Sequence, residues 1–112
     1  IMGREIPAVH YMVAVFGGPV VRCAPYATYG TAELSAFAVE AIKDRSACLL
    51  AHHGVIVGGE SLSKAMWLAV ELETLAAQYV ECLQMGNPPV LDDDEIERVK
   101  NKIESGSYGA SS

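Results

Sequence analysis

Residues 49–57 form an apolar, strand-like run that two adjacent histidines, His52 and His53, interrupt just before Gly54. A run this rich in apolar residues predicts a buried strand or hairpin. A polar ring inside it must be hydrogen-bonded or bound to something. Because successive side chains of a strand point to opposite faces, we expect at most one imidazole to enter any given pocket. The pattern is typical either of a satisfied core histidine beside a turn or of a metal ligand, since neutral imidazole is the commonest one.

The length and composition limit the chain to one domain or a piece of one. Its 112 residues are 51% hydrophobic, which is rich for so short a chain, because small domains leave much of their surface exposed. We therefore expect burial against another subunit or against a further portion of the same fold. The net charge of −6, without a basic stretch, predicts no nucleic-acid partner.

The three cysteines, Cys23, Cys48 and Cys82, are odd in number and lack the spacing of a metal motif. They are typical of buried free thiols in a reducing compartment, so we expect a cytoplasmic protein. The longest apolar helix pattern contains charged residues such as Lys64 and Glu71, which predicts that it does not cross a membrane.

Hydrophobic periodicity and turn signals predict the order β-β-α-β-β-α-α. The expected strands cover residues 6–16, 20–24, 47–53 and 55–57, and the expected helices begin at the N-caps Thr31, Ser61 and Asp92. Hairpin-like strand pairs with helices against them predict an α/β fold: part of an α/β/α sandwich with a mixed, mostly antiparallel sheet. The Ser- and Gly-rich residues 105–112 are expected to form a flexible tail.

Few other residues indicate a chemistry. The sequence has no Gly-x-Ser-x-Gly motif and no phosphate-binding glycine loop that leads into a helix. Tyr11 alternates with His10 in the first expected strand, so the two should point to opposite faces. Tyr11 is either a core or interface residue or a general acid, and Tyr108 is either a disordered aromatic or a lid over a neighbour's pocket. Catalytic zinc takes three protein ligands, so most ligands of a metal bound here would come from elsewhere.

Three segments together resemble a known family. Residues 6–12 read IPAVHYM, residues 23–35 read CAPYATYGTAELS, and residues 49–54 read LLAHHG. In this order and spacing they are similar to the second half of the class II (zinc-dependent) aldolases of the aldolase/adducin family, and the likeness continues to residue 108. The resemblance implies that residues 1–112 are the C-terminal half of a single class II aldolase/adducin domain.

The resemblance also implies roles for individual residues. His53 matches a zinc-ligating histidine, and His52 would then face away and pack. Tyr11 matches a tyrosine that reaches into a neighbouring subunit's site and acts as a proton donor to the aldehyde oxygen. Tyr108 matches a C-terminal tyrosine that closes over that site. The His-x-His zinc pair, the glutamate base and the phosphate-binding loops, which the family places earlier, do not occur in this sequence.

The implied function is that of a Zn²⁺-dependent aldolase, active as a homo-oligomer, most simply a tetramer, whose sites are shared between subunits. Zinc would act as a Lewis acid while a ketose phosphate such as L-fuculose 1-phosphate is cleaved to dihydroxyacetone phosphate and an aldehyde. One alternative keeps the fold: a sugar-phosphate 4-epimerase, a dehydratase or a decarboxylase. The other is a non-catalytic structural domain like the adducin head, against which His53 and Tyr11 argue.

Overall fold

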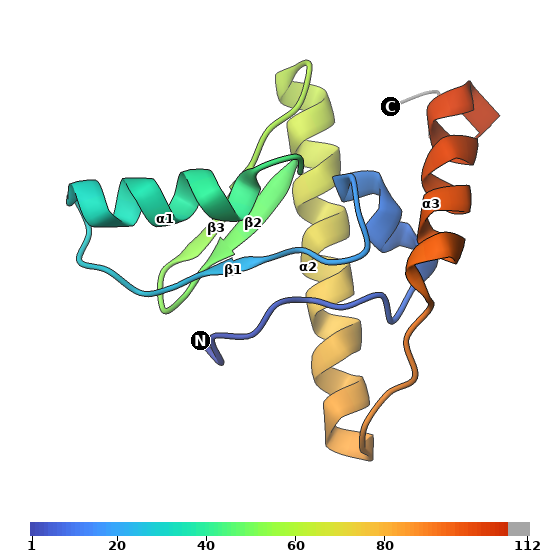
Figure 1. The fold of residues 1–112 in the computed structure, drawn as a ribbon, viewed down its shortest axis with the longest axis horizontal. Helices are drawn as coiled ribbons and strands as arrows, with labels where there is room; N and C mark the ends of the chain where they lie inside the picture. The colour runs from blue at the N-terminus through green and yellow to red at the C-terminus, as the bar shows by residue number, and fades with distance from the viewer. Residues whose placement is uncertain (108–112) are drawn as a thin grey trace.

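The computed structural model describes residues 1–107, which form three layers with a small sheet in the middle (Figure 1). Helix α1 (Ala32–Ile42) covers one face of the sheet, and the long helix α2 (Leu62–Met85) lies along the other. Helix α3 (Asp93–Lys102) packs beyond α2 against a short 3-10 helix, η1 (Tyr11–Phe16). Within this part of the chain no helix is both long and apolar enough to cross a membrane.

The sheet has three strands in the order β1-β2-β3 and is mixed, as the sequence predicts. Strand β1 (Cys23–Ala24) runs parallel to β2 (Ala47–Leu50), and α1 forms the crossover between them. Strand β3 (Gly54–Val57) returns antiparallel to β2 in the longer of the two pairings, with Ala47 opposite Val57. This hairpin sets the position of the two histidines.

Alternate residues of the sheet belong to two separate cores, which confirms the predicted sandwich. On the α1 face, Cys48 and Leu50 pack with Ala24, Phe37 and Ala41. On the other face, Ala47 and Leu49 join a larger cluster built from α2, α3 and η1, with Phe16, Leu68, Leu72, Leu75 and Ile96 among its buried members. Since a strand alternates its side chains between two faces, burial on both sides follows from the near-continuous apolar character of β2.

The predicted strand at residues 6–16 is wrong. Only Ile6 pairs, through a bridge in which its N–H donates to Val21 O at 2.9 Å, and the chain then turns into η1. Four of the six η1 residues are buried, because the helix packs against both α2 and α3. A continuous apolar run has no period that separates a buried strand from a buried helix. Gly17 ends η1 at a φ of 103°, a left-handed conformation that glycine adopts readily.

The three predicted N-caps are confirmed. Thr31, Ser61 and Asp92 each accept a hydrogen bond from the backbone N–H three residues further on, at 3.2, 3.1 and 2.8 Å. Each bond satisfies one of the N–H groups that the first helical turn leaves unpaired. Of the expected tail at 105–112, residues 105–107 belong to η2 (Ile103–Ser107), which Gly106 interrupts with a non-helical φ of 86°, and residues 108–112 lie outside the described residues. The flexibility of this segment stays a prediction.

Two arginines, Arg22 and Arg45, form hydrogen bonds to backbone carbonyl groups near the sheet and α1. Arg22 donates from one nitrogen to three carbonyl oxygens at the carboxyl end of α1, those of Glu40, Ala41 and Lys43. A cation at this end also complements the helix dipole. Arg45 donates to Val20 O at 3.1 Å and lies so close over Gly18 that a Cβ there would stand 2.3 Å from its Cζ. These contacts fix the segment that links η1 to β1.

Candidate functional site

Both histidines of the apolar run lie in the turn between β2 and β3, which corrects the expectation of a strand to residue 53. The backbone N–H of His53 donates to Leu50 O at 3.0 Å and closes the turn. His52 takes the left-handed conformation, with a φ of 57°, and both histidines are exposed. Strand β2 ends at Leu50 because a three-residue hairpin loop uses the next residues to reverse the chain. The argument from opposite strand faces is therefore wrong.

The two imidazoles differ in what they contact. The His52 ring packs edge-on against Tyr26, with 5.9 Å between ring centroids. Within residues 1–107 the His53 side chain has no hydrogen-bond, ion-pair or ring partner. The two imidazoles therefore differ only in the ring contact of His52, and the His53 side chain is the one that no other side chain of the described residues holds.

A cavity of about 480 Å³ opens beside this turn. Residues 49–55 form one wall, the amino-terminal residues 1–4 form another, and Ala76, Tyr79 and Val80 of α2 contribute a third. Most of these side chains are apolar, and the two imidazoles are the polar groups of the turn that border it. A largely apolar hollow with a few polar groups is typical of a small-molecule site.

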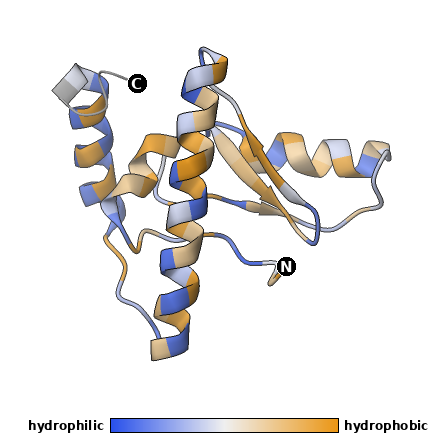
Figure 2. Ribbon diagram, turned by 180° about the vertical axis from the view of Figure 1, so that it is seen from behind, coloured by the Kyte–Doolittle hydropathy of each residue, from blue (hydrophilic) through white to orange (hydrophobic). Residues whose placement is uncertain are grey.

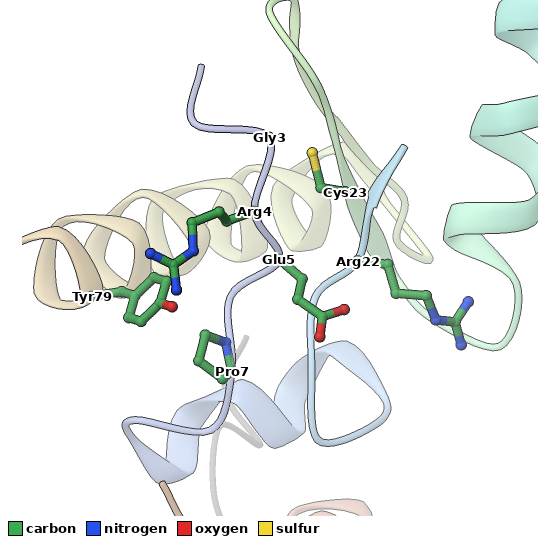
Figure 3. Close-up of a pocket in the computed structure, with 7 residues that line it drawn as sticks. All are labelled: Gly3, Arg4, Glu5, Pro7, Arg22, Cys23 and Tyr79. Carbon is green, nitrogen blue, oxygen red and sulfur yellow. The ribbon is translucent and has the colours of Figure 1, made fainter. Parts of the chain in front are cut away.

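A second cavity, of about 560 Å³, adjoins the first and shares four of its residues, Gly3, Arg4, Cys23 and Tyr79. The Arg4 guanidinium lies over the Tyr79 ring, 5.8 Å from its centroid. Figure 3 shows Arg4 and Arg22 extending to opposite sides, with the Glu5 carboxylate between them. Because Arg22 is engaged with α1 and a carboxylate is present, this hollow does not present a concentrated positive charge to an anion.

The cysteines are free thiols, as predicted. Cys48 is fully buried, and its burial raises the pKa of the thiol above the usual value. Cys23 borders both cavities, and partial burial raises its pKa as well. Since the thiolate is the reactive form, these cysteines stay protonated near neutral pH and are poor nucleophiles.

The described residues do not by themselves provide the ligand set of a metal site. In residues 1–107 no three His, Cys, Asp or Glu side chains come together in a way that could hold a metal ion. An exposed, unengaged imidazole at the rim of a cavity fits one position of a zinc site, and His53 provides it. The remaining ligands would have to come from outside this part of the chain.

Tyr11 is the one large exposed side chain of η1, with 38% of its surface accessible. The sequence places it opposite His10, but the structure stacks the two rings, with centroids 4.7 Å apart and planes 26° apart. The prediction fails because His10 is the N-cap of η1 and Tyr11 its first residue, so no strand pleat separates them.

The structure does not bring Tyr11 and His53 together within one chain. Helix η1 lies beside α3 on one side of α2, and the sheet lies on the other side, in both views (Figures 1 and 2). Tyr11 lines neither cavity. Tyr108, the third predicted site residue, lies outside the described residues.

Two contacts at the site carry no signal in the sequence. The sequence predicts neither the cap that His10 forms on η1 nor the contact of Tyr26 with the histidine turn. An N-cap is recognised by a following helical period, which residues 11–16 lack. The contact of Tyr26 depends on how the β1–α1 loop folds back on the hairpin, and no local spacing encodes it.

Comparison with known proteins defines the class to which this fold and site belong. Residues 1–80 match the family described as the class II aldolase and adducin N-terminal domain. The chain therefore belongs to the class II aldolase and adducin family.

Within this family, the chain is similar to several proteins named as sugar-phosphate aldolases. The chain is 55% identical over 108 residues to the 5-methylthioribulose-1-phosphate/5-deoxyribulose-1-phosphate aldolase of Rhodospirillum rubrum, covering 96% of this chain and 48% of that protein. It is 50% identical over 110 residues to the L-fuculose phosphate aldolase of Escherichia coli K12, covering 97% and 50%. A solved structure of L-fuculose 1-phosphate aldolase superimposes with a TM-score of 0.87 at 42% identity, over 92% of this chain and 48% of that one. The chain thus spans about half the length of the relatives it matches.

Proposed function

We propose that this chain is the C-terminal half of a zinc-dependent class II aldolase that cleaves a ketose phosphate, such as L-fuculose 1-phosphate, into dihydroxyacetone phosphate and an aldehyde. The observation that carries the proposal is the unengaged imidazole of His53 at the rim of a cavity. It occurs in a chain about half identical to proteins named as sugar-phosphate aldolases. The names of these relatives add 5-methylthioribulose 1-phosphate and 5-deoxyribulose 1-phosphate as further candidate substrates.

In this proposal His53 supplies one zinc ligand, and the other ligands lie in the half of the domain that this sequence does not contain. A bound Zn²⁺ would supply Lewis-acid stabilisation of the negative charge that develops as the carbon–carbon bond breaks. His52 supports the turn through Tyr26 and does not bind the metal. The exposed position of the turn is compatible with this arrangement, because a ligand supplied to a site built from two halves must face outward from its own half.

Tyr11 is proposed to exchange a proton with the aldehyde oxygen: it takes the proton up on cleavage and donates it on condensation. Within one chain Tyr11 is remote from His53, so we propose that it serves the site of a neighbouring subunit in a cytoplasmic homotetramer. Two features support this: the exposure of its ring on an otherwise buried helix, and exposed apolar side chains on α2, which are Leu62, Met66, Val70, Val80 and Met85. Tyr108 is proposed, from the family resemblance alone, to close over the same site.

The test compares two alanine variants of the full-length protein that contains this chain. His53→Ala should abolish bound zinc and lower kcat/KM for cleavage by at least about 10³-fold, equivalent to about 4 kcal/mol. The matched control His52→Ala should keep its zinc and most of its activity. Zinc is measured by elemental mass spectrometry, and dihydroxyacetone phosphate by a coupled reduction. Equal zinc content in the two variants would overturn the assignment of His53.

Product analysis separates the proposal from the alternatives with the same fold. An aldolase releases dihydroxyacetone phosphate, whereas a 4-epimerase, a dehydratase and a decarboxylase do not split the sugar into two such fragments. A zinc-loaded protein that turns over a ketose phosphate without forming dihydroxyacetone phosphate would replace the aldolase assignment and leave the metal site intact.

A further inference from the structure

We infer that His10 is a positioning residue for Tyr11, holding both the backbone and the ring of the tyrosine in place; the inference rests on the proposed role of Tyr11 in proton transfer. Two contacts join His10 to the start of η1. Its Nδ1 accepts a hydrogen bond from the backbone N–H of Met12 at 3.1 Å. Its ring stacks on that of Tyr11, with centroids 4.7 Å apart.

The hydrogen bond fixes the backbone on either side of Tyr11. Helix η1 has only six residues, and its first N–H groups have no partner inside the helix. His10 has the extended backbone of an N-cap, with φ −145° and ψ 145°, and its side chain satisfies the N–H of the buried Met12. Tyr11 lies between the cap and the capped group, so the start of its side chain is set by this bond.

The stacking contact is a restraint on the ring itself. Met12, Val13, Ala14 and Phe16 are held by the core, whereas Tyr11 points outward with 38% of its surface exposed. An exposed phenol has rotational freedom that burial does not remove. The imidazole restricts it, because a flat ring packed nearly parallel to the phenol leaves fewer orientations for the hydroxyl group.

The hydrogen bond also defines the tautomer of the imidazole. Nδ1 can accept the hydrogen bond from Met12 only when it carries no proton, so the neutral ring has its proton on Nε2. The ring then keeps one N–H donor, at Nε2. His10 thus acts through Tyr11 and need not contact the substrate.

Two substitutions separate the contacts. His10→Asn keeps a side-chain acceptor suited to an N-cap but removes the ring, and His10→Phe keeps a flat ring but removes the acceptor. Both are made in the full-length protein, alone and with Tyr11→Phe, and kcat, KM and the unfolding midpoint are measured for each. If His10 positions Tyr11, His10→Asn should fold normally and lose about 10- to 100-fold in kcat at nearly unchanged KM. The same substitution in the Tyr11→Phe background should cause no further loss, which is the signature of two residues that act as a unit.

Two outcomes would overturn the inference: a His10→Asn protein with the kcat of the parent, or an equal loss in kcat whether or not Tyr11 is present. Failure of the proposed function gives a different result, because Tyr11→Phe would then retain the parental kcat. In that case the Tyr11 ring resonances, observed by NMR with labelled tyrosine, decide the positioning role. They should shift in His10→Asn, which removes the stacked ring, and resonances unchanged in that variant would exclude the stack.

Discussion

The histidine turn and helix η1 are held in place by different interactions. Each places an aromatic polar side chain next to apolar sequence. The turn exposes its two imidazoles and is held by its own backbone, through the His53–Leu50 hydrogen bond and the left-handed conformation of His52. Helix η1 is held by its surroundings, because most of its residues are buried against α2 and α3 and Tyr11 alone is left outside as a large side chain.

This difference predicts different effects of substituting the two proposed site residues. A residue in a turn fixed by local geometry can be replaced with little effect on the core, so its loss affects mainly ligand binding. A residue on a helix fixed by burial depends on the packing beneath it. The position of the proposed metal ligand therefore depends on the backbone of the turn, and the position of the proposed proton-transfer group depends on the packing of η1. The two residues can then act in sites of different subunits without disturbing each other.

The largest effect on activity is expected when an intact histidine turn and an intact helix η1 come from different subunits. His53→Ala and Tyr11→Phe should each inactivate the full-length protein, and mixing the two should restore activity at about a quarter of the sites in a closed ring with random subunit exchange. Activity is assayed after exchange has been demonstrated by native mass spectrometry. Each variant mixed with itself is the control. Exchange without recovery of activity would mean that Tyr11 acts within its own subunit or takes no part in the chemistry.

Stability should separate the two regions next. Phe16→Ala empties a fully buried position of η1 and should lower the free energy of unfolding by about 3–5 kcal/mol. His53→Ala in the exposed turn should change it by no more than about 0.5 kcal/mol in metal-free protein. Chemical denaturation of both variants measures the difference. Comparable losses would show that the turn is anchored by more than its backbone.

The smallest expected effect tests the backbone of the turn itself. At a φ of 57°, glycine is unstrained and alanine is not. His52→Gly should therefore be more stable than His52→Ala by about 1 kcal/mol, and since both remove the contact with Tyr26, that contact cancels in the comparison. The two unfolding midpoints give the answer, and equal values would mean that residue 52 does not keep the left-handed conformation in solution.

Features encoded by neighbouring residues are predictable from this sequence, and features encoded by distant ones are not. The caps Thr31, Ser61 and Asp92 depend on a side chain and an N–H group three residues apart, and all three are confirmed. The sandwich follows from apolar periodicity and is confirmed as well. The strand prediction for residues 6–16 is wrong because their continuous apolar run contains no period that distinguishes a helix from a strand.

In the candidate site, too, the residue types can be predicted from the sequence and their tertiary contacts cannot. The residue types at positions 11 and 53 indicate the chemistry, and their roles stay predictions. Their surroundings depend on tertiary contacts: the stacked ring of His10 and the edge contact of Tyr26 with His52. Because both histidines lie in a turn, the argument from opposite strand faces does not distinguish His53 from His52. The choice now rests on the freedom of its side chain and on the family resemblance.

The contact between Arg45 and Gly18 links two positions that are far apart in the sequence. The guanidinium occupies the space where a side chain at residue 18 would stand, and from there its Nε reaches the carbonyl of Val20. Any larger residue at 18 must push the arginine aside and break that bond, while a shorter residue at 45 leaves the same carbonyl without its donor. A side chain at residue 18 is therefore accommodated more easily when residue 45 is short, so the residue types tolerated at the two positions depend on each other.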